Sequence, residues 1–280
     1  MLHGTQHDRG NPRRVGCVSY LNAKPLIDGL DPAAAELTLD VPSRLIGRLL
    51  GGEVEAALCS VVDYFRYADR LRLVPVSGIG CAGPTLTVRL FSRVPIDRIQ
   101  RVHADTDSHT SVLLMRLLLA EQHGLRPAVV DFSARETAPD AWPETVLLIG
   151  DKVVTDAPPG GIYRHQLDLG KAWHALTGRP FVFAVWMAER GRDLGTLPGV
   201  LAERLTTNLS RIDAIVERYA ADHGWDPDPA AEYLGRILRY RVGPEELAGI
   251  EAFARRLSDR GLLELTEQAC APEVYTPLPL

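Results

Sequence analysis

Lysine is almost missing from this sequence. Its three copies are Lys24, Lys152 and Lys171, so arginine supplies nearly all of the positive charge, and the net charge is −5. No basic run is dense enough to bind nucleic acid. No apolar run approaches the ~20 residues of a membrane-spanning helix. We therefore expect a protein that binds neither nucleic acid nor membranes.

Cysteine is also scarce, and its spacing fits no metal site. Cys17, Cys59, Cys81 and Cys270 form no C-x-x-C pair, and no cluster of His, Cys and Asp has the spacing of metal ligands. No glycine-rich phosphate loop or dinucleotide-binding motif follows a predicted strand. We therefore expect no metal and no cofactor. The thiols are interpreted as buried and reduced, the alternative being a nucleophile or a metal set.

What the chain does have is enough apolar sequence for a large core. Hydrophobic residues make up 46% and charged residues 24% of its 280 residues, as in soluble globular proteins. A chain of this length forms one large domain or two lobes. Residues 1–13 are polar and lack the apolar segment of a signal peptide, which predicts a flexible tail and a cytoplasmic location. The sequence predicts no particular oligomeric state.

Strand and helix patterns alternate along the first part of the chain. Strands are predicted at residues 14–19, 36–41, 54–59 and 72–76, with helices at 43–50 and 61–68 between them. This alternation is typical of a parallel sheet covered by helices, and therefore of the α/β class.

A second unit of the same kind begins after Pro95. Its predicted strands are residues 101–104, 127–132 and 146–149, and its main helix is 112–122. Residues 78–84 are interpreted as a flexible turn and residues 165–177 as a helix. The C-terminal helices, among them residues 229–240, show no pattern typical of chemistry, and we expect them to contribute packing alone.

The two units predict two lobes with a central cleft. Lobe one would be residues 14–94 and 181–280, lobe two residues 95–180, and strands at 86–92 and 181–187 would cross between them. Clefts between lobes are preferred sites for small molecules, and closure of the lobes can exclude water.

Polar side chains gather at the predicted ends of strands. Asn22 follows the first strand, Ser60 follows the third, and a hydroxyl-rich loop at 105–111 precedes the apolar helix. Ligands of open α/β sheets bind at such ends, and the starts of helices favour anions. Thr87 lies on the polar face of a strand at 85–92, so all of these groups would converge on the cleft. The alternative is that Asn22 and the loop hydroxyls only cap helices.

Two ionisable residues lie among these groups. His109 would be a ligand contact or a base, or else a surface or capping residue. Asp151 follows the strand at 146–149, where it would act as an acid or base, cap the next turn, or bridge the two lobes. We favour the cap or the bridge, because a bare carboxylate would repel an anionic ligand.

Six motifs occur in this chain in one order and register. They are Val-Gly-x-x-x-Tyr-Leu-Asn-x-x-Pro-Leu at 15–26, Gly-Glu-Val-Glu-Ala-Ala-Leu-Cys-Ser-Val-Val-Asp-Tyr at 52–64, Gly-Pro-x-x-Thr at 83–87, Ser-His-Thr-Ser-Val at 108–112, Leu-Ile-Gly-Asp at 148–151, and Gly-x-Pro-Phe-Val-Phe-Ala-Val-Trp at 178–186. Together they resemble the MqnA family, the chorismate dehydratases of the futalosine route to menaquinone. The resemblance implies a two-lobe α/β fold of the type 2 periplasmic-binding-protein kind. It also implies a cytoplasmic lyase that removes water from chorismate to give 3-[(1-carboxyvinyl)oxy]benzoate.

The resemblance further implies which residues meet the substrate. Asn22 falls on the family's asparagine, and as the catalytic residue it is expected to orient the substrate and stabilise developing charge. Substrate binding is expected of Tyr20, Ser60, Thr87, Ser108, His109, Thr110 and Ser111. Thr87 stands where the family often has serine, and His109 stands where some relatives have arginine. No residue stands out as a base, so we expect the substrate's own side-chain carboxylate to remove the proton.

Two other functions fit parts of this pattern. One is the sister enzyme of the same pathway, 1,4-dihydroxy-6-naphthoate synthase, whose opening motif this chain does not show. The other is a non-catalytic binding protein for a small carboxylate ligand, because a fold does not fix a function. Turnover separates the last of these from the enzymes, since a binding protein would leave chorismate unchanged.

Overall fold

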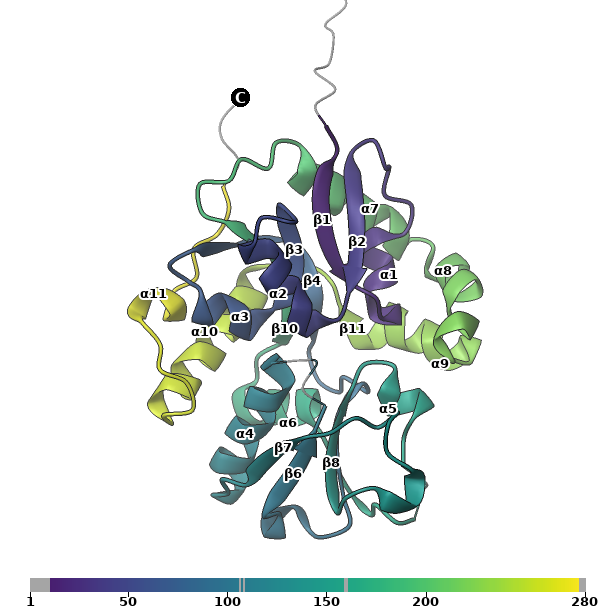
Figure 1. The fold of residues 1–280 in the computed structure, drawn as a ribbon, viewed down its shortest axis with the longest axis vertical. Helices are drawn as coiled ribbons and strands as arrows, with labels where there is room; N and C mark the ends of the chain where they lie inside the picture. The colour runs from purple at the N-terminus through teal and green to yellow at the C-terminus, as the bar shows by residue number, and fades with distance from the viewer. Residues whose placement is uncertain (1–10, 106, 108, 159–160, 277–280) are drawn as a thin grey trace, which may run out of the picture.

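Two β-sheets, each with helices packed on it, form an upper and a lower lobe in Figure 1. The computed structural model describes residues 11–276 apart from residues 106, 108, 159 and 160. The upper lobe holds the two ends of the described chain, and the lower lobe is built from its middle, coloured teal. The two-lobe α/β arrangement predicted from the sequence is therefore confirmed.

The upper sheet has six strands within the described residues. Their order is β11 (Leu238–Arg239), β4 (Leu71–Cys81), β10 (Phe181–Glu189), β3 (Ala56–Ser60), β1 (Arg13–Val18) and β2 (Ala35–Asp40). Strand β1 pairs in parallel with β2 and β3, as the alternating pattern predicts. Strand β10 runs antiparallel between β3 and β4. All five residues of β3 are buried, which is typical of a strand covered on both faces.

Helices from both ends of the chain pack on this sheet. They are η1 (Leu21–Ala23), α1 (Lys24–Ile27), α2 (Pro42–Leu50), α3 (Val61–Arg66), α7 (Leu197–Leu209), α8 (Ile212–Tyr219), η4 (Ala221–His223), α9 (Pro227–Glu232), the π-helical η5 (Tyr233–Ile237), α10 (Pro244–Asp259) and α11 (Glu267–Cys270). Helix α2 shows how sequence produces these elements. Pro42 begins it, where a backbone N–H would have no partner, and Leu45 and Leu49 lie buried on one face.

The lower sheet has five strands within the described residues. Their order is β7 (Ala128–Asp131), β6 (Arg101–Ala104), β8 (Thr145–Ile149), β5 (Val88–Ser92) and β9 (His165–Asp168). Its helical segments are η2 (Ile96–Arg98), α4 (His109–His123), η3 (Pro139–Ala141), α5 (Lys152–Thr155) and α6 (Leu169–Thr177). Helix α4 buries six consecutive or near-consecutive apolar side chains between residues 113 and 119, so it lies in the core as its sequence predicts.

The chain passes between the lobes twice, from β4 to β5 and from α6 to β10. The predicted lobe boundaries at residues 94 and 181 stay a prediction. The chain enters the lower sheet before residue 94, because β5 already hydrogen-bonds to β8 and β9 in that sheet. The first connection is therefore the short segment of residues 82–87.

The prediction of a flexible turn at residues 78–84 is wrong for residues 78–81, which continue β4. The glycines there allow a neighbouring strand to come close. A Cβ atom on Gly78 would lie 2.6 Å from the carbonyl oxygen of Ala184, and one on Gly80 would lie 2.6 Å from that of Phe181. Both contacts come from β10, so these glycines mark a close approach of two strands and not a bend.

The predicted helix at residues 165–177 begins later than expected. Residues 165–168 form β9, which pairs with β5, and α6 starts at Leu169. Asp168 ends the strand and caps the helix, because its side chain accepts a hydrogen bond from the backbone N–H of Lys171. This capping bond explains the change from strand to helix at that residue.

The thiols of β1 and β3 lie in the core, as predicted. Cys17 and Cys59 are both fully buried and neither forms a disulfide. Burial raises the pKa of the Cys17 thiol to about 12. A thiol with such a pKa stays protonated and is a poor nucleophile. Across the described residues, no helix is both long and apolar enough to cross a bilayer.

Candidate functional site

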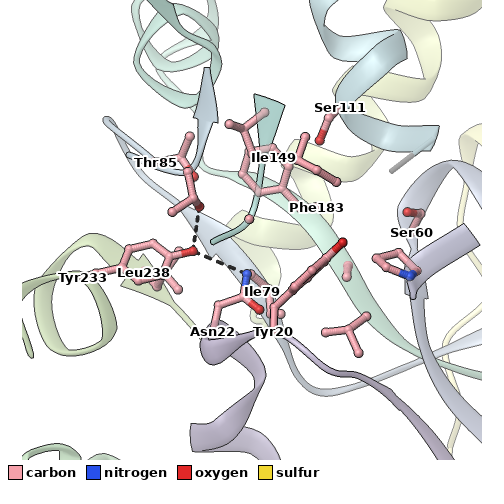
Figure 2. A pocket seen from close by; sticks show the side chains of 16 residues that line it. Tyr20, Asn22, Ser60, Ile79, Thr85, Ser111, Ile149, Phe183, Tyr233 and Leu238 are labelled. Atoms are coloured by element: carbon pink, nitrogen blue, oxygen red, sulfur yellow. Dashed lines mark hydrogen bonds between the residues drawn. The ribbon is translucent and has the colours of Figure 1, made fainter. Parts of the chain in front are cut away.

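A pocket of about 520 Å³, including its open mouth, lies between the two sheets. Figure 2 shows Asn22 and Tyr233 on one side of it and Ser60 and Ser111 on the other. The described residues around it are Val18, Tyr20, Asn22, Pro42, Ser60, Ile79, Thr85, Thr87, Val88, Ser111, Ile149, Gly150, Phe183, Ala184, Tyr233 and Leu238.

Asn22 reaches this pocket because β1 ends just before it. The chain turns at Tyr20 into the short helix η1, which places the Asn22 side chain at the carboxyl end of the strand. The Asn22 Nδ2 atom donates to the Tyr233 hydroxyl at 3.4 Å. Its Oδ1 atom is buried and has no hydrogen-bond partner among the described residues. Buried polar atoms normally have partners, so this free acceptor is typical of a ligand site.

Tyr233 links Asn22 to Thr87. Its hydroxyl lies 2.6 Å from Thr87 Oγ1, and its ring stacks on Trp225 with centroids 4.9 Å apart. Burial is the main reason that the pKa of Tyr233 is raised, although the hydrogen bonds with Thr87 and Asn22 oppose it. The phenol is therefore neutral at physiological pH and acts as a hydrogen-bonding group.

Two serines face these groups from the ends of helices. Ser60 is the last residue of β3, directly before α3, and Ser111 lies in the first turn of α4. Both side chains are almost fully buried. The amino end of the fifteen-residue α4 carries partial positive charge, which favours an anion beside Ser111.

Tyr20 forms part of the pocket wall and contacts the lower lobe. Its ring lies 3.4 Å from the position that a Cβ atom on Gly150 would occupy, so a larger residue there would press on the ring. Its hydroxyl donates to Asp107 at 3.3 Å. Burial, with the nearby charges of Asp107 and Asp105, raises the pKa of Tyr20, so this phenol is also neutral.

Two of the described residues predicted to bind substrate, Thr110 and His109, do not line the pocket. Thr110 Oγ1 accepts a hydrogen bond from the backbone N–H of Val62 at 3.2 Å. His109 Nδ1 lies 2.7 Å from Asp63 Oδ1. Both contacts join α4 of the lower lobe to α3 of the upper lobe. Ser108 lies outside the described residues.

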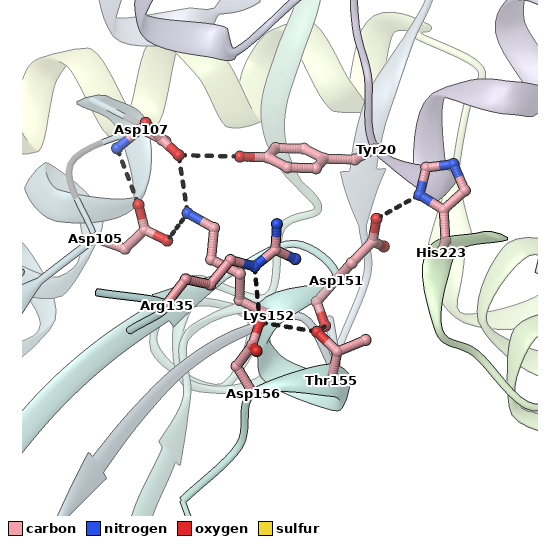
Figure 3. A network of polar contacts seen from close by, with 9 residues as sticks. All are labelled: Tyr20, Asp105, Asp107, Arg135, Asp151, Lys152, Thr155, Asp156 and His223. Atoms are coloured by element: carbon pink, nitrogen blue, oxygen red, sulfur yellow. Dashed lines mark hydrogen bonds and ion pairs between the residues drawn. The ribbon is translucent and has the colours of Figure 1, made fainter. Parts of the chain in front are cut away.

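Asp151 also connects the lobes. Its carboxylate accepts from the backbone N–H of Leu21 at 3.2 Å and from Trp225 Nε1 at 3.0 Å. It lies 2.8 Å from His223 Nδ1, as Figure 3 shows. Asp151 follows β8 of the lower sheet, whereas all three partners belong to segments of the upper lobe. Its oxygens are thus engaged in contacts between the lobes.

A charged cluster lies beside Tyr20. Lys152 Nζ contacts Asp105 at 2.5 Å and Asp107 at 2.8 Å (Figure 3). Burial raises the pKa of Asp105, although Lys152 opposes this effect. Because two carboxylates surround one ammonium group, the cluster cannot supply net positive charge to an anionic ligand.

The pocket is thus a set of neutral donors between apolar walls. The described residues around it carry no carboxylate, imidazole, amine or guanidinium group. Amide and hydroxyl groups can bind carboxylates and stabilise a developing negative charge. The walls of Ile79, Ile149 and Phe183 can hold a ring and exclude water. The described lining supplies no strong base.

The sequence-based expectation that residues 229–240 contribute packing alone is wrong, because Tyr233 forms part of the pocket. Its partners Asn22 and Thr87 are 211 and 146 residues away in the chain. No motif marks this tyrosine in the sequence, and the structure places it at the start of the π-helical η5. Thr85 also lines the pocket; it lies on the polar face that is predicted to converge on the cleft, although the predicted substrate-binding residues do not include it.

The fold defines the class of protein as periplasmic-binding-protein-like. An aliphatic sulphonate-binding protein from Escherichia coli is similar, with a TM-score of 0.62 and 17% identity, over 91% of this chain and 94% of that one. A protein from Archaeoglobus fulgidus has a TM-score of 0.70 and 15% identity, over 92% of this chain and 100% of that one. At these identities the likeness shows the fold alone.

Sequence comparison places the chain more narrowly. Residues 13–259 match a family model described as menaquinone biosynthesis. A chorismate dehydratase from Thermus thermophilus is 31% identical over 263 residues, which are 88% of this chain and 95% of that protein. This chain belongs to that menaquinone biosynthesis family.

Proposed function

We propose that this protein is a chorismate dehydratase, a hydro-lyase that converts chorismate into 3-[(1-carboxyvinyl)oxy]benzoate and water. The likeness to the Thermus thermophilus enzyme over 88% of the chain carries this proposal. The pocket supports it, because chorismate has two carboxylates, a ring and no phosphate. Hydroxyls, an amide and a helix amino end suit such a ligand. As a biosynthetic enzyme it would work in the cytoplasm.

The reaction needs little from the protein besides position and charge stabilisation. The hydrogen on the ring carbon that bears the enolpyruvyl ether is acidic, because that carbon is vinylogous to the ring carboxylate. A base removes this proton, and the electron pair enters the ring as the neighbouring hydroxyl group leaves. The proton and the hydroxide together make the water that is lost. The product ring is a benzene ring, so aromatisation drives the step.

Asn22 is assigned to the developing negative charge. Its amide is a poor base, but its Nδ2 donor and the neighbouring hydroxyls can bind the delocalised enolate. Asn22 Nδ2 donates to the Tyr233 hydroxyl, which leaves the Tyr233 proton free to be donated to Thr87 Oγ1, 2.6 Å away. The Thr87 proton is then available to a substrate carboxylate. This chain of hydrogen bonds would orient one carboxylate of chorismate.

The proposed base is the side-chain carboxylate of chorismate itself. His109 and Asp151 are the ionisable candidates from the sequence, and both are engaged in contacts between lobes. We expect His109→Ala and Asp151→Asn to keep most of the kcat of the wild-type protein. A variant of either residue that kept its affinity for chorismate but lost nearly all of its kcat would identify a protein base and reject substrate-assisted proton removal.

Turnover of chorismate tests the proposal directly. The purified protein is incubated with chorismate, and the product is followed by ultraviolet absorbance and by mass. We expect a product that is lighter by one water and has the absorbance of a substituted benzoate. Unchanged chorismate, with tight binding of another anion, would reject the lyase and favour the binding protein.

A further inference from the structure

The connection from β4 to β5 contains a strained turn. Leu86 has a φ angle of 66° and is the one non-glycine residue with positive φ among those that the structure describes. The backbone N–H of Thr87 donates to the carbonyl oxygen of Thr85 at 2.7 Å. A hydrogen bond across a single central residue with positive φ defines a γ-turn of the rare, strained form. Side chains larger than glycine disfavour this conformation.

One carboxylate holds this turn in place. Asp168 accepts from the backbone N–H groups of Thr85 at 3.0 Å and of Leu86 at 2.9 Å. The same carboxylate accepts from the backbone N–H of Lys171, which caps α6. The turn and the start of α6 are also closely packed. A Cβ atom on Gly170 would lie 2.7 Å from the carbonyl oxygen of Gly83 in the same connection.

The turn decides where the Thr87 hydroxyl points. Thr87 follows Leu86 directly, and its Oγ1 atom lies 2.6 Å from the Tyr233 hydroxyl. Its carbonyl oxygen accepts from the backbone N–H of Gly150 at 2.8 Å. Thr87 is therefore fixed by the strained turn on one side and by Gly150, directly after β8, on the other. Backbone strain that persists in a pocket wall needs surrounding contacts to maintain it, and Asp168 supplies them.

We propose that Asp168 is a positioning residue of the active site, which holds the turn at Leu86 so that the Thr87 hydroxyl faces the substrate. This inference rests on the proposed function, in which Thr87 binds a substrate carboxylate. Capping of α6 alone would need one oxygen, and serine or threonine would supply it. A carboxylate has a second oxygen. Here Oδ1 accepts from Lys171 and Thr85, while Oδ2 accepts from Leu86 and lies 3.6 Å from the Arg89 guanidinium.

Two substitutions separate the turn from the cap. Asp168→Ser keeps one acceptor for Lys171 but cannot also reach Leu86, and Asp168→Asn keeps the shape but replaces one oxygen by a donor. We expect both to lower kcat/KM for chorismate by about 10- to 100-fold, as small errors of position do. The melting temperature of Asp168→Ser should stay within a few degrees of wild type. The matched control is Asp193→Asn, since Asp193 accepts from the backbone N–H of Gly195 far from the pocket.

A double-mutant cycle tests whether Asp168 acts through Thr87. In a Thr87→Val background, which lacks the hydroxyl, Asp168→Asn should cost less than threefold in kcat/KM. An equal cost in both backgrounds would show a merely structural role and overturn the inference. So would Asp168 variants as active as wild type. If the wild-type protein does not turn over chorismate, the proposed function is wrong. This outcome is distinguishable from a failure of the proposed role of Asp168, which is measured on an active wild-type protein.

If the Asp168 variants do not fold, substitutions at Leu86 test whether the strained turn positions Thr87. Leu86→Gly and Leu86→Ala both remove the leucine side chain, but only alanine is disfavoured at positive φ. We expect Leu86→Gly to have the higher melting temperature and at least threefold higher kcat/KM. At an ordinary position alanine is the more stabilising of the two residues. A reversed order would therefore reject a strained turn that positions Thr87.

Discussion

Asn22 and Asn208 both place an amide where the N-terminal segment meets the C-terminal helices, but their hydrogen bonds differ. Asn208 is fully buried on α7, donates to the carbonyl oxygens of Pro25 and Asp28, and accepts from Arg211. Asn22 makes one bond, to Tyr233, and its Oδ1 atom has no partner among the described residues. The first amide completes the structure, whereas the second keeps bonding capacity for a ligand.

The charges around the two amides differ in the same way. Beside Asn208, the Asp28 carboxylate is paired with Arg211, with Arg218 at 3.0 Å and with the Tyr219 hydroxyl at 2.7 Å. Around Asn22, the described pocket residues are neutral. Charges are thus paired in the cluster that holds the helices together, where one carboxylate meets two guanidinium groups. Charged side chains are absent from the described residues around the pocket. A pair of charged side chains there would compete with an anionic substrate.

The largest expected effect is that of Asn22→Ala on activity. We expect kcat/KM for chorismate to fall by about 10²–10³-fold, the loss seen when a donor to a developing oxyanion is removed. The free energy of unfolding should change little, because the Asn22 amide makes one long hydrogen bond, at 3.4 Å to Tyr233, and its Oδ1 atom has no partner among the described residues. Steady-state kinetics and chemical denaturation of the same preparation measure both quantities.

Asn208→Ala is the matched control, because it removes the same amide from the cluster at Asp28. We expect it to cost about 3 kcal/mol in free energy of unfolding, since buried acceptors lose their donor. The kcat/KM of the protein that remains folded should match wild type. If Asn22→Ala destabilised the protein as much as Asn208→Ala, or left activity intact, the contrast between the two amides would be broken.

Asp28→Asn tests the ion pairs of Asp28 with Arg211 and Arg218 in the same cluster. Burial disfavours the charged form of Asp28, but Tyr219, Arg218 and Arg211 outweigh it and lower its pKa. A carboxyl group with a lowered folded-state pKa stabilises the fold above its unfolded pKa of about 3.9, and this is lost as pH falls through the folded value. We expect the variant to be less stable by about 2 kcal/mol at pH 7.

Denaturation at several pH values checks this expectation. The difference between wild type and Asp28→Asn should shrink below about pH 4, because wild-type Asp28 then becomes protonated and neutral as well. Activity at pH 7 should be unchanged. A difference that stayed constant down to pH 2 would show that shape, and not charge, accounts for the role of Asp28.

Local patterns in the sequence predicted most of the fold and part of the pocket. The strand ends near Asn22 and Ser60 could be found because each comes after a short apolar run: β1 ends at Val18, shortly before Asn22, and Ser60 is the last residue of β3. The glycines of β4 gave a wrong prediction, because glycine occurs both in turns and where two strands come close. Only the position of β10 shows that the second case applies here. The turn at Leu86 could not be predicted, since leucine gives no local sign of positive φ.

The contribution of the C-terminal helices depends on contacts between residues far apart in the sequence. Tyr233 reaches the pocket because Trp225 stacks on it, and Asp151 in turn bonds to Trp225. The second of these contacts forms only when the two lobes come together, because Asp151 follows β8 of the lower sheet and Trp225 belongs to the upper lobe. A single sequence shows neither, so the C-terminal helices could be predicted as helices but not as part of the candidate site.

The smallest expected effect, that of Tyr233→Phe, sharpens the comparison because it removes one oxygen from the pocket. We expect about a tenfold loss in kcat/KM, since Thr87 and Asn22 both lose a partner that orients them. Tyr240→Phe is the matched control, because the buried Tyr240 hydroxyl has no partner among the described residues. It should leave kcat/KM unchanged and raise stability slightly. Equal kcat/KM values for the two variants would show that the Tyr233 hydroxyl has no role in the site, and that Asn22 orients the substrate without it.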